Sequence, residues 1–277
     1  MSRTVGPHSG VRALRGALTA LMLVGASACQ MHAPTDTPQP GSGVVDLKLP
    51  DGEVQRVLYV EPEHPKAVIV PLLGGDGWLF IDGAGETTPP YFLVSRRDLW
   101  LAQGIAVAAI HTAEPIHGNR LTERSVRTVE AVVAYLHTRT DAPIWLVGHS
   151  NGAISAVNDA AHLTHGEIAG LVLLSSVTRL GSSNAGTVFG AGLDRVTVPT
   201  LIVSHTDDPC IATPPADAPL IRAALTKAPK SEVMIVNGGT AGSPYTSYCG
   251  GSAHSFAGMH PELIERVATW IKAQPAG

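Results

Sequence analysis

The chain has few aromatic residues, few cysteines and no excess of basic residues. Aromatic side chains make up 5% of its 277 residues, too few to indicate the stacking surface that polysaccharide- or nucleic-acid-binding proteins use. The formal net charge of −4 also argues against nucleic acid as a partner, because phosphate backbones attract basic proteins. The three cysteines lack the paired spacing of a zinc site. We therefore expect no nucleic-acid partner, no metal and no cofactor.

The apolar run near the N-terminus is too short to cross a membrane permanently. It covers residues 17–24, whereas a membrane-spanning helix needs about 20 apolar residues. Three arginines precede it and small residues follow it up to Ala28, which is the pattern of a signal peptide. We expect residues 1–28 to be removed during export. The loss of the three arginines would change the net charge from −4 to −7.

Cys29 follows these small residues directly, and this arrangement resembles the lipobox of bacterial lipoproteins. The resemblance implies a lipid anchor on Cys29. Because Gln30 rather than aspartate comes next, it also implies sorting to the outer membrane of a Gram-negative cell. Cleavage by the ordinary signal peptidase after Ala28 is the alternative, and it would give a periplasmic or secreted protein. Residues 29–43 are rich in Pro, Thr, Gly and Ser and predict a flexible linker behind the anchor.

Residues 44–277 alternate between strand-like and helical segments and predict one domain. The expected strands are 44–49, 54–60, 67–73, 105–110, 144–147, 169–174, 199–204 and 232–237. The expected helices are 92–103, 121–138, one directly after Gly152 and a last one from Pro261. After an antiparallel entry hairpin, this alternation predicts an α/β fold with a doubly wound, mostly parallel sheet.

Ser150 is the candidate nucleophile, because it lies in Gly148-His-Ser-Asn-Gly152 between a predicted strand and a predicted helix. A sharp turn at this place lifts a serine hydroxyl clear of the backbone, and it requires small residues two positions to either side. The structural alternative is that Ser150 only caps the helix.

A serine hydroxyl is a poor nucleophile and needs a base. His254 is our candidate because it follows the strand 232–237 and a glycine-rich loop and precedes the last helix. His260 is the rival, but it stands where the N-cap of that helix should be. The acid that orients the histidine should follow the strand 199–204, where the loop contains both Asp207 and Asp208.

The oxyanion of an acyl-transfer intermediate needs two backbone N–H donors. Asn151, directly after the serine, should supply one of them. The loop Gly74-Gly-Asp-Gly77 follows the strand 67–73, and its glycines allow close approach to a substrate. We expect Gly75 to supply the second donor, with Asp76 next in order. No Gly-Lys-Ser/Thr follows this loop, so phosphate binding is not indicated.

These segments together resemble the α/β-hydrolase superfamily, and the match covers nearly all of the mature chain. Within it the chain resembles bacterial exported serine hydrolases, through the segments 74–77, 145–152, 207–210 and 254–256. The resemblance implies a triad of Ser150, Asp208 and His254, since the acid of such enzymes lies about four residues beyond its strand. Asp76 departs from the pattern, because a carboxylate near a developing oxyanion would repel it.

The resemblance also implies a disulfide, because a cysteine after the acid accompanies another before the histidine in these proteins. Cys210 and Cys249 hold these positions, and an exported protein meets an oxidising environment. We expect a Cys210–Cys249 bond that joins the acid loop to the histidine loop, with free thiols as the alternative.

Several other polar or aromatic residues lie near the predicted site. We expect His149 to have a packing role, and His111 and His205 either to line the pocket or to be bystanders. His111, Glu114 and His117 form only a weak metal-site pattern, because a loop can place them anywhere. Trp78 and Phe80 could form a pocket wall or core packing.

Residues 176–197, where lids are usually inserted, are short and rich in Gly, Ser and Asn. We therefore expect a short or absent lid and an open site for short or soluble substrates. The hypothesis is a serine hydrolase that cleaves small-molecule carboxylic esters. Amide, peptide or thioester hydrolysis and a non-catalytic binding lipoprotein are the alternatives.

Overall fold

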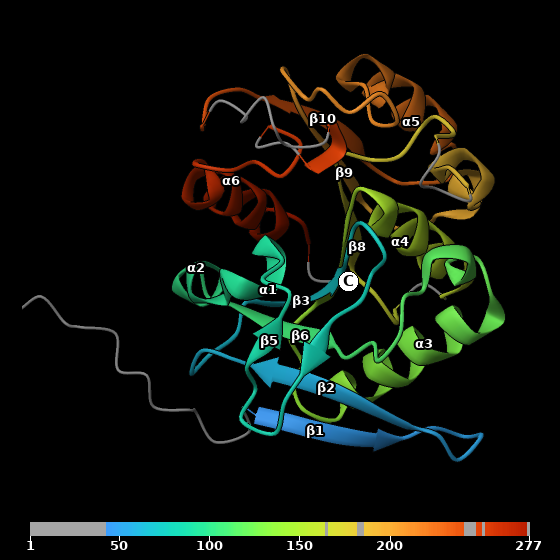
Figure 1. Ribbon diagram of the computed structural model, residues 1–277. Coiled ribbons are helices and arrows are strands. Elements are labelled where there is room, and N and C mark those ends of the chain that lie inside the picture. Colours follow the sequence, from blue (N-terminus) through green and yellow to red (C-terminus); the bar gives the residue numbers. More distant parts are fainter. Residues whose placement is uncertain (1–42, 164–165, 182–185, 241–247, 251–252, 276–277) are drawn as a thin grey trace, which may run out of the picture. The chain divides into compact units, whose positions relative to one another are not determined.

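The strand-forming segments of the sequence build one large, mostly parallel sheet in the computed structural model (Figure 1). The structure describes residues 43–163, 166–181, 186–240, 248–250 and 253–275. The predicted signal peptide, Cys29 and nearly all of the predicted linker lie outside these residues. No helix in the described part of the chain is long and apolar enough to cross a membrane.

The eight strands of the sheet follow the order β1-β2-β6-β3-β7-β8-β9-β10. They are β1 (Gly43–Lys48), β2 (Val54–Val60), β3 (Ala67–Leu72), β6 (Ile105–Ile110), β7 (Ile144–His149), β8 (Gly170–Leu174), β9 (Thr200–His205) and β10 (Ser231–Val236). The β1–β2 and β2–β6 pairs are antiparallel, and all later pairs are parallel. The predicted strands are confirmed to within two residues at their ends, because short, nearly continuous apolar runs are typical of strands covered on both faces.

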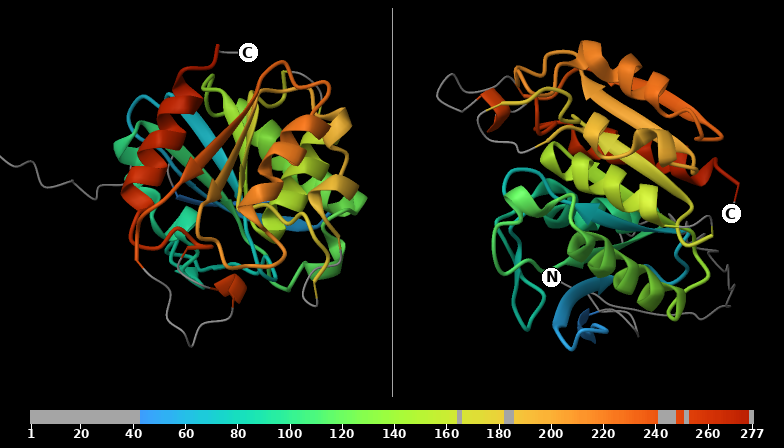
Figure 2. Two further views of the ribbon diagram at one scale, coloured as in Figure 1. Left: turned by 90° about the horizontal axis from the view of Figure 1, so that it is seen from above. Right: turned by 90° about the vertical axis from the view of Figure 1, so that its right-hand side faces the viewer.

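Helices cover both faces of the sheet (Figure 2). On one face lie α3 (Glu123–His137), α4 (Asn151–His162) and α5 (Ala218–Ala224), and on the other α1 (Phe92–Ser95), α2 (Arg97–Ala102) and α6 (His260–Lys272). In α3 an apolar stripe faces the core, and Thr122 caps the N-terminus by accepting from Ser125 N–H. The doubly wound architecture is confirmed.

The structure differs from the prediction in several local features, one of which is the unpredicted helix α5. The expected helix 92–103 is two helices, because Arg96 leaves the helical region with φ −103° and ψ 32°. Helix α6 begins one residue earlier than predicted, at His260, and Met259 is its N-cap. A small hairpin of β4 (Phe80–Ile81) and β5 (Thr87–Thr88) was not predicted, since two-residue strands show no periodicity.

The segment between β8 and β9 holds no long helix among its described residues, which are 175–181 and 186–199. They contain only the short 3-10 turns η2 (Val188–Gly190) and η3 (Leu193–Arg195). This part of the chain agrees with the expected short or absent lid. The face at the carboxyl ends of the parallel strands is seen from the front in Figure 1.

Candidate active site

Ser150 lies at a sharp turn between β7 and α4. Its φ of 55° and ψ of −123° are a strained conformation for a residue other than glycine. A Cβ on Gly152 would overlap the Leu72 carbonyl, and one on Gly148 would lie 2.6 Å from the Gly152 carbonyl oxygen. The two glycines therefore permit the turn. Ser150 holds the N-cap position of α4 but makes no capping hydrogen bond with its side chain, which argues against the purely structural alternative.

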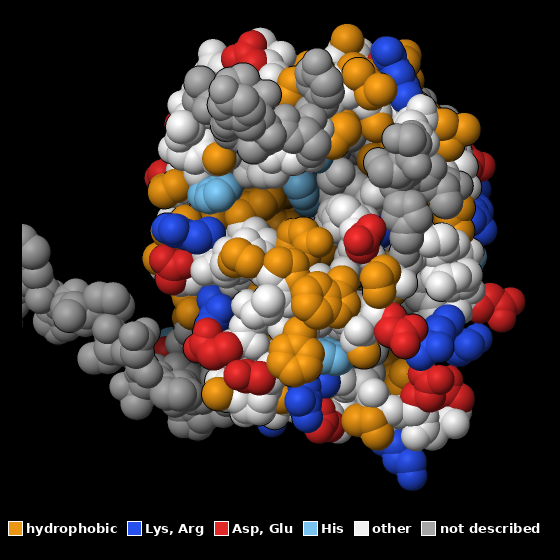
Figure 3. All heavy atoms as spheres, viewed as in Figure 1, with side chains coloured by type: hydrophobic (Ala, Val, Ile, Leu, Met, Phe, Trp, Pro, Cys, Tyr) orange, Lys and Arg blue, Asp and Glu red, His pale blue; other side chains and the backbone are white. Residues whose placement is uncertain are grey.

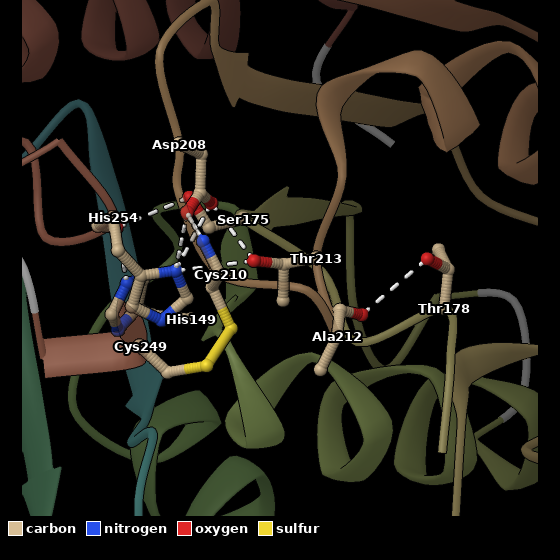
Figure 4. Close-up of a disulfide and its surroundings, with 9 residues drawn as sticks. All are labelled: His149, Ser175, Thr178, Asp208, Cys210, Ala212, Thr213, Cys249 and His254. Carbon is tan, nitrogen blue, oxygen red and sulfur yellow. Dashed lines mark hydrogen bonds and ion pairs between the residues drawn. A yellow bond between two sulfur atoms is a disulfide. The ribbon is translucent and has the colours of Figure 1, made fainter. Parts of the chain in front are cut away.

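Asp208 and His254 form a buried, hydrogen-bonded pair at the carboxyl ends of the parallel strands (Figure 4). The Nδ1 atom of His254 lies 3.0 Å and 3.2 Å from the two carboxylate oxygens of Asp208. Asp207 is exposed, and its N–H donates to His205. The structure thus brings Asp208, and not Asp207, to the histidine.

Thr213 is a further polar contact of this pair that the sequence did not reveal. Its hydroxyl donates to Asp208 Oδ2 at 2.8 Å and lies 3.2 Å from His254 Nδ1. The N–H of Cys210 donates to the other carboxylate oxygen of Asp208 at 3.0 Å. Burial by itself would raise the pKa of Asp208, but the hydrogen bonds from His254, Cys210 N–H and Thr213 lower it below the usual value. The carboxylate is therefore held ionised.

His149 fixes the backbone of His254. Its Nε2 lies 3.0 Å from the His254 carbonyl oxygen, and because a carbonyl only accepts, Nε2 must carry the proton. Ser175 donates to the same oxygen at 3.2 Å. Burial and the neighbouring His254 lower the pKa of His149 to about 3, so its ring is neutral. His149 has a packing role, as predicted, and it ties the histidine loop to the serine turn.

A small hollow opens beside Ser150 and is lined from five segments of the chain. Its walls are Gly75, Asp76, Ser150, Asn151, Val177, Cys210, Ala212 and Cys249. Both predicted oxyanion donors, Gly75 and Asn151, therefore line the same space as the predicted nucleophile. Between the described residues, no hydrogen bond joins the Ser150 hydroxyl to His254.

The loop that contains Gly75 is held from behind by polar side chains. The Gly75 carbonyl oxygen accepts from Arg120 Nη2 at 2.8 Å and from Asn151 Nδ2 at 3.2 Å. Arg120 is buried and was not predicted, because it lies in an irregular segment 45 residues from Gly75. Its contacts depend on long-range packing that no local motif encodes.

The predicted disulfide between Cys210 and Cys249 is present and forms one wall of the hollow. It joins the loop after β9 to η5 (Tyr248–Gly250), which precedes His254. His205 makes a second connection, since its ring lies 3.0 Å from the Gly238 carbonyl oxygen beyond β10. The acid loop and the histidine side of the site are thus linked both covalently and by a hydrogen bond.

The remaining candidates do not line the hollow. His111 accepts from Ile81 N–H at 3.0 Å and so supports β4, and Trp78 donates to the Ala113 carbonyl. His260 packs flat on Phe92, with ring centroids 4.8 Å apart. Among the described residues, no group of three metal-ligating side chains occurs.

Solved structures of other proteins share this architecture, although no protein-family profile and no curated protein matches the chain. The esterase Est1E from Butyrivibrio proteoclasticus aligns with a TM-score of 0.54 and 17% identity, over 84% of this chain and 100% of that chain. A dienelactone hydrolase from Anabaena variabilis aligns at 0.57 and 15%, over 84% and 97%. A puromycin-hydrolyzing peptidase from Mycobacterium tuberculosis aligns at 0.58 and 15%, over 85% of this chain and 40% of that chain. Such low identities concern the fold alone, and together with the sheet order they show that this chain has the α/β-hydrolase fold.

Proposed function

We propose that the protein is a serine hydrolase that cleaves carboxylic esters through an acyl-enzyme intermediate. One observation carries the proposal: a strained strand-to-helix turn places Ser150 in a hollow beside the buried Asp208–His254 pair. Strain of this kind persists only where the surrounding structure holds it, and it is typical of active sites. Two of the structural relatives named above are an esterase and a lactone hydrolase, which supports the same chemistry.

In this mechanism Ser150 Oγ attacks the acyl carbon while His254 Nε2 takes its proton. Asp208 accepts from Nδ1, fixes the tautomer and stabilises the imidazolium. The bond to the alcohol breaks, and the alcohol leaves with the proton of His254. A water molecule then attacks the acyl-enzyme, again with His254 as base, which releases the acid and restores Ser150. Catalytic hydrogen bonds are often long before substrate binds, so the Ser150–His254 contact belongs to the substrate complex.

The shape and polarity of the site favour short, neutral acyl groups. The hollow has a volume of about 100 Å³, well below the roughly 300 Å³ of pockets that hold drug-sized ligands. Val177, Ala212 and the disulfide form its apolar part. Apolar side chains gather in the middle of this face, and charged ones lie mostly toward its margins (Figure 3). These features favour a small ester over a strongly charged or polymeric substrate.

Labelling with a fluorophosphonate probe tests the proposal directly, because the probe reacts with an activated serine. The wild type should be labelled, and Ser150→Ala and His254→Ala should lose the label. Ser95→Ala and His64→Ala are matched controls, because Ser95 is half-buried, His64 is exposed, and neither residue lines the hollow. A folded wild type that takes no label would contradict the proposal and favour a non-catalytic binding protein.

A substrate panel separates esters from the alternative amide, peptide and thioester substrates, which the same residues could attack. We expect p-nitrophenyl acetate and butyrate to be hydrolysed faster than the decanoate ester or the matching p-nitroanilides. Faster cleavage of the anilides would replace the ester assignment with an amidase or peptidase.

A further inference from the structure

Arg120 is buried behind the loop that contains Gly75, with an exposed fraction of 4%. Arginine is rarely buried, since moving a charged group out of water costs free energy unless it is paired or hydrogen-bonded. Its Nε atom has no hydrogen-bond partner among the described residues. Burial of the guanidinium therefore costs free energy, and its two hydrogen bonds indicate what the buried position serves.

Those two contacts connect the Gly75 loop to the helix that follows the nucleophile. Nη2 donates to the Gly75 carbonyl oxygen at 2.8 Å, and Nη1 donates to Ser155 Oγ in α4 at 3.1 Å. Gly77 leaves room for the guanidinium, since a Cβ there would lie 2.9 Å from Nη2. Arg120 thus sets the position of the loop relative to Ser150 and Asn151, which stand at the start of α4.

The contact with the Gly75 carbonyl also determines the direction of the next N–H group. In a trans peptide the C=O and the following N–H point in opposite directions, and the described residues contain a cis bond only at Thr88–Pro89. Arg120 and Asn151 Nδ2 both hold the Gly75 oxygen. The N–H of Asp76 therefore points away from them, and Asp76 lines the hollow beside Ser150.

The charge of Arg120 would strengthen this N–H as a donor. A cation at the carbonyl end polarises the peptide unit, and hydrogen bonds in a chain reinforce one another. Burial lowers the pKa of Arg120 to about 10, opposed by Tyr91, Asp76 and Asp159, so the guanidinium is charged at neutral pH. A fixed positive charge behind the loop also favours negative charge that develops in front of it.

We propose that Arg120 is a positioning residue that holds the Gly75–Asp76 peptide so that Asp76 N–H joins Asn151 N–H in the oxyanion hole. This inference rests on the proposed function. It replaces Gly75 by Asp76 as the second donor, and it assigns the backbone of Asp76 rather than its carboxylate to the chemistry.

Steady-state hydrolysis of p-nitrophenyl acetate by Arg120→Met tests the inference. Misplacement of an oxyanion donor costs roughly 10- to 100-fold in kcat, so we expect a loss of that size with KM nearly unchanged. The inhibition constant of a boronic acid, which mimics the tetrahedral intermediate, should rise in parallel. Arg120→Lys keeps the charge but cannot make both hydrogen bonds, so its kcat should lie between those of the wild type and Arg120→Met. Arg124→Met is the matched control, since Arg124 is exposed and pairs with Glu53.

Fluorophosphonate titration of active sites separates loss of folding from loss of positioning. A kcat per titrated site equal to that of the wild type, or an unchanged boronic acid inhibition constant, would overturn the inference. If Arg120→Met does not fold, Ser155→Ala removes one of the two contacts and should lower kcat per site several-fold, and no change there would overturn it. A wild type without esterase activity would instead refute the proposed function itself.

Discussion

Two buried side chains, His149 and Asp159, have opposite effects on how the stability of the folded protein varies with pH. Burial, together with His254, lowers the pKa of His149 from 6.5 to about 3. Burial raises the pKa of Asp159 from 3.8 to about 7, against hydrogen bonds from Asn158 and Ser125. Both groups are neutral in the folded protein at mildly acidic pH. On unfolding at such a pH, His149 takes up a proton and Asp159 releases one.

The signs follow from which state binds more protons. As pH falls below 6.5, the unfolded chain protonates His149 while the folded chain does not until about pH 3, so stability falls. Between pH 7 and 3.8 the folded chain holds a proton on Asp159 that the unfolded chain lacks, so stability rises as pH falls. Each effect is at most about 1.4 kcal/mol per pH unit, and over the shared range they offset each other.

Asp159→Asn should therefore expose the His149 effect. As the pH is lowered from 7 to 4, we expect the free energy of unfolding of the variant to fall relative to that of the wild type, by up to about 1.4 kcal/mol per pH unit. Urea unfolding at several pH values measures this difference, with the exposed Asp141→Asn as control. A difference between wild type and Asp159→Asn that does not vary with pH would show that Asp159 is ionised in the folded protein.

At the scale of the loops, the Cys210–Cys249 disulfide joins the segment that carries Asp208 to the segment that carries His254. The bond spans 39 residues of sequence, and chain entropy predicts about 4 kcal/mol of stabilisation for a closed loop of this size. The double variant Cys210→Ser/Cys249→Ser should lose stability of that order. It should also lose esterase activity at temperatures where it is still folded, because the acid loop is no longer fixed relative to the histidine loop.

Thermal unfolding with and without reductant checks the disulfide prediction. Reduction should lower the melting temperature of the wild type toward that of the double variant and leave the variant itself unchanged. Equal melting temperatures of the wild type with and without reductant would contradict it.

For the entire protein, we propose export and attachment to a membrane through a lipid on Cys29. The motivation is the order of arginines, a short apolar run and small residues before this cysteine. Expression of the full chain in a Gram-negative host with an alkyne-tagged palmitate should label the wild type but not Cys29→Ser. Cys249→Ser is the control for nonspecific labelling of cysteine. An exported, processed and unlabelled wild type would indicate ordinary signal peptidase cleavage instead.

Much of this fold could be predicted from the sequence, because its determinants are local. Fully buried parallel strands are short apolar runs, and amphipathic helices such as α3 show their stripe directly. The serine turn is also local, since the glycines it needs are Gly148 and Gly152. The segments of the proposed triad could be named because each follows a recognisable strand. The break of the predicted helix at Arg96 was missed, since a single non-helical residue leaves the apolar pattern intact.

The resemblance favoured Asp208 over Asp207, but the residues of the loop allowed either, and the contact between Asp208 and His254 is visible only in the folded chain, because adjacent residues differ in where their side chains point. It also showed Thr213, which lies 41 residues before His254, and Arg120, which lies 45 residues after Gly75. Their side chains act through hydrogen bonds between loops, and packing of the whole sheet sets the distances between those loops. Local sequence patterns specify the elements and mark the candidate nucleophile, whereas the contacts that orient the acid, the histidine and the oxyanion loop exist only once the chain is folded.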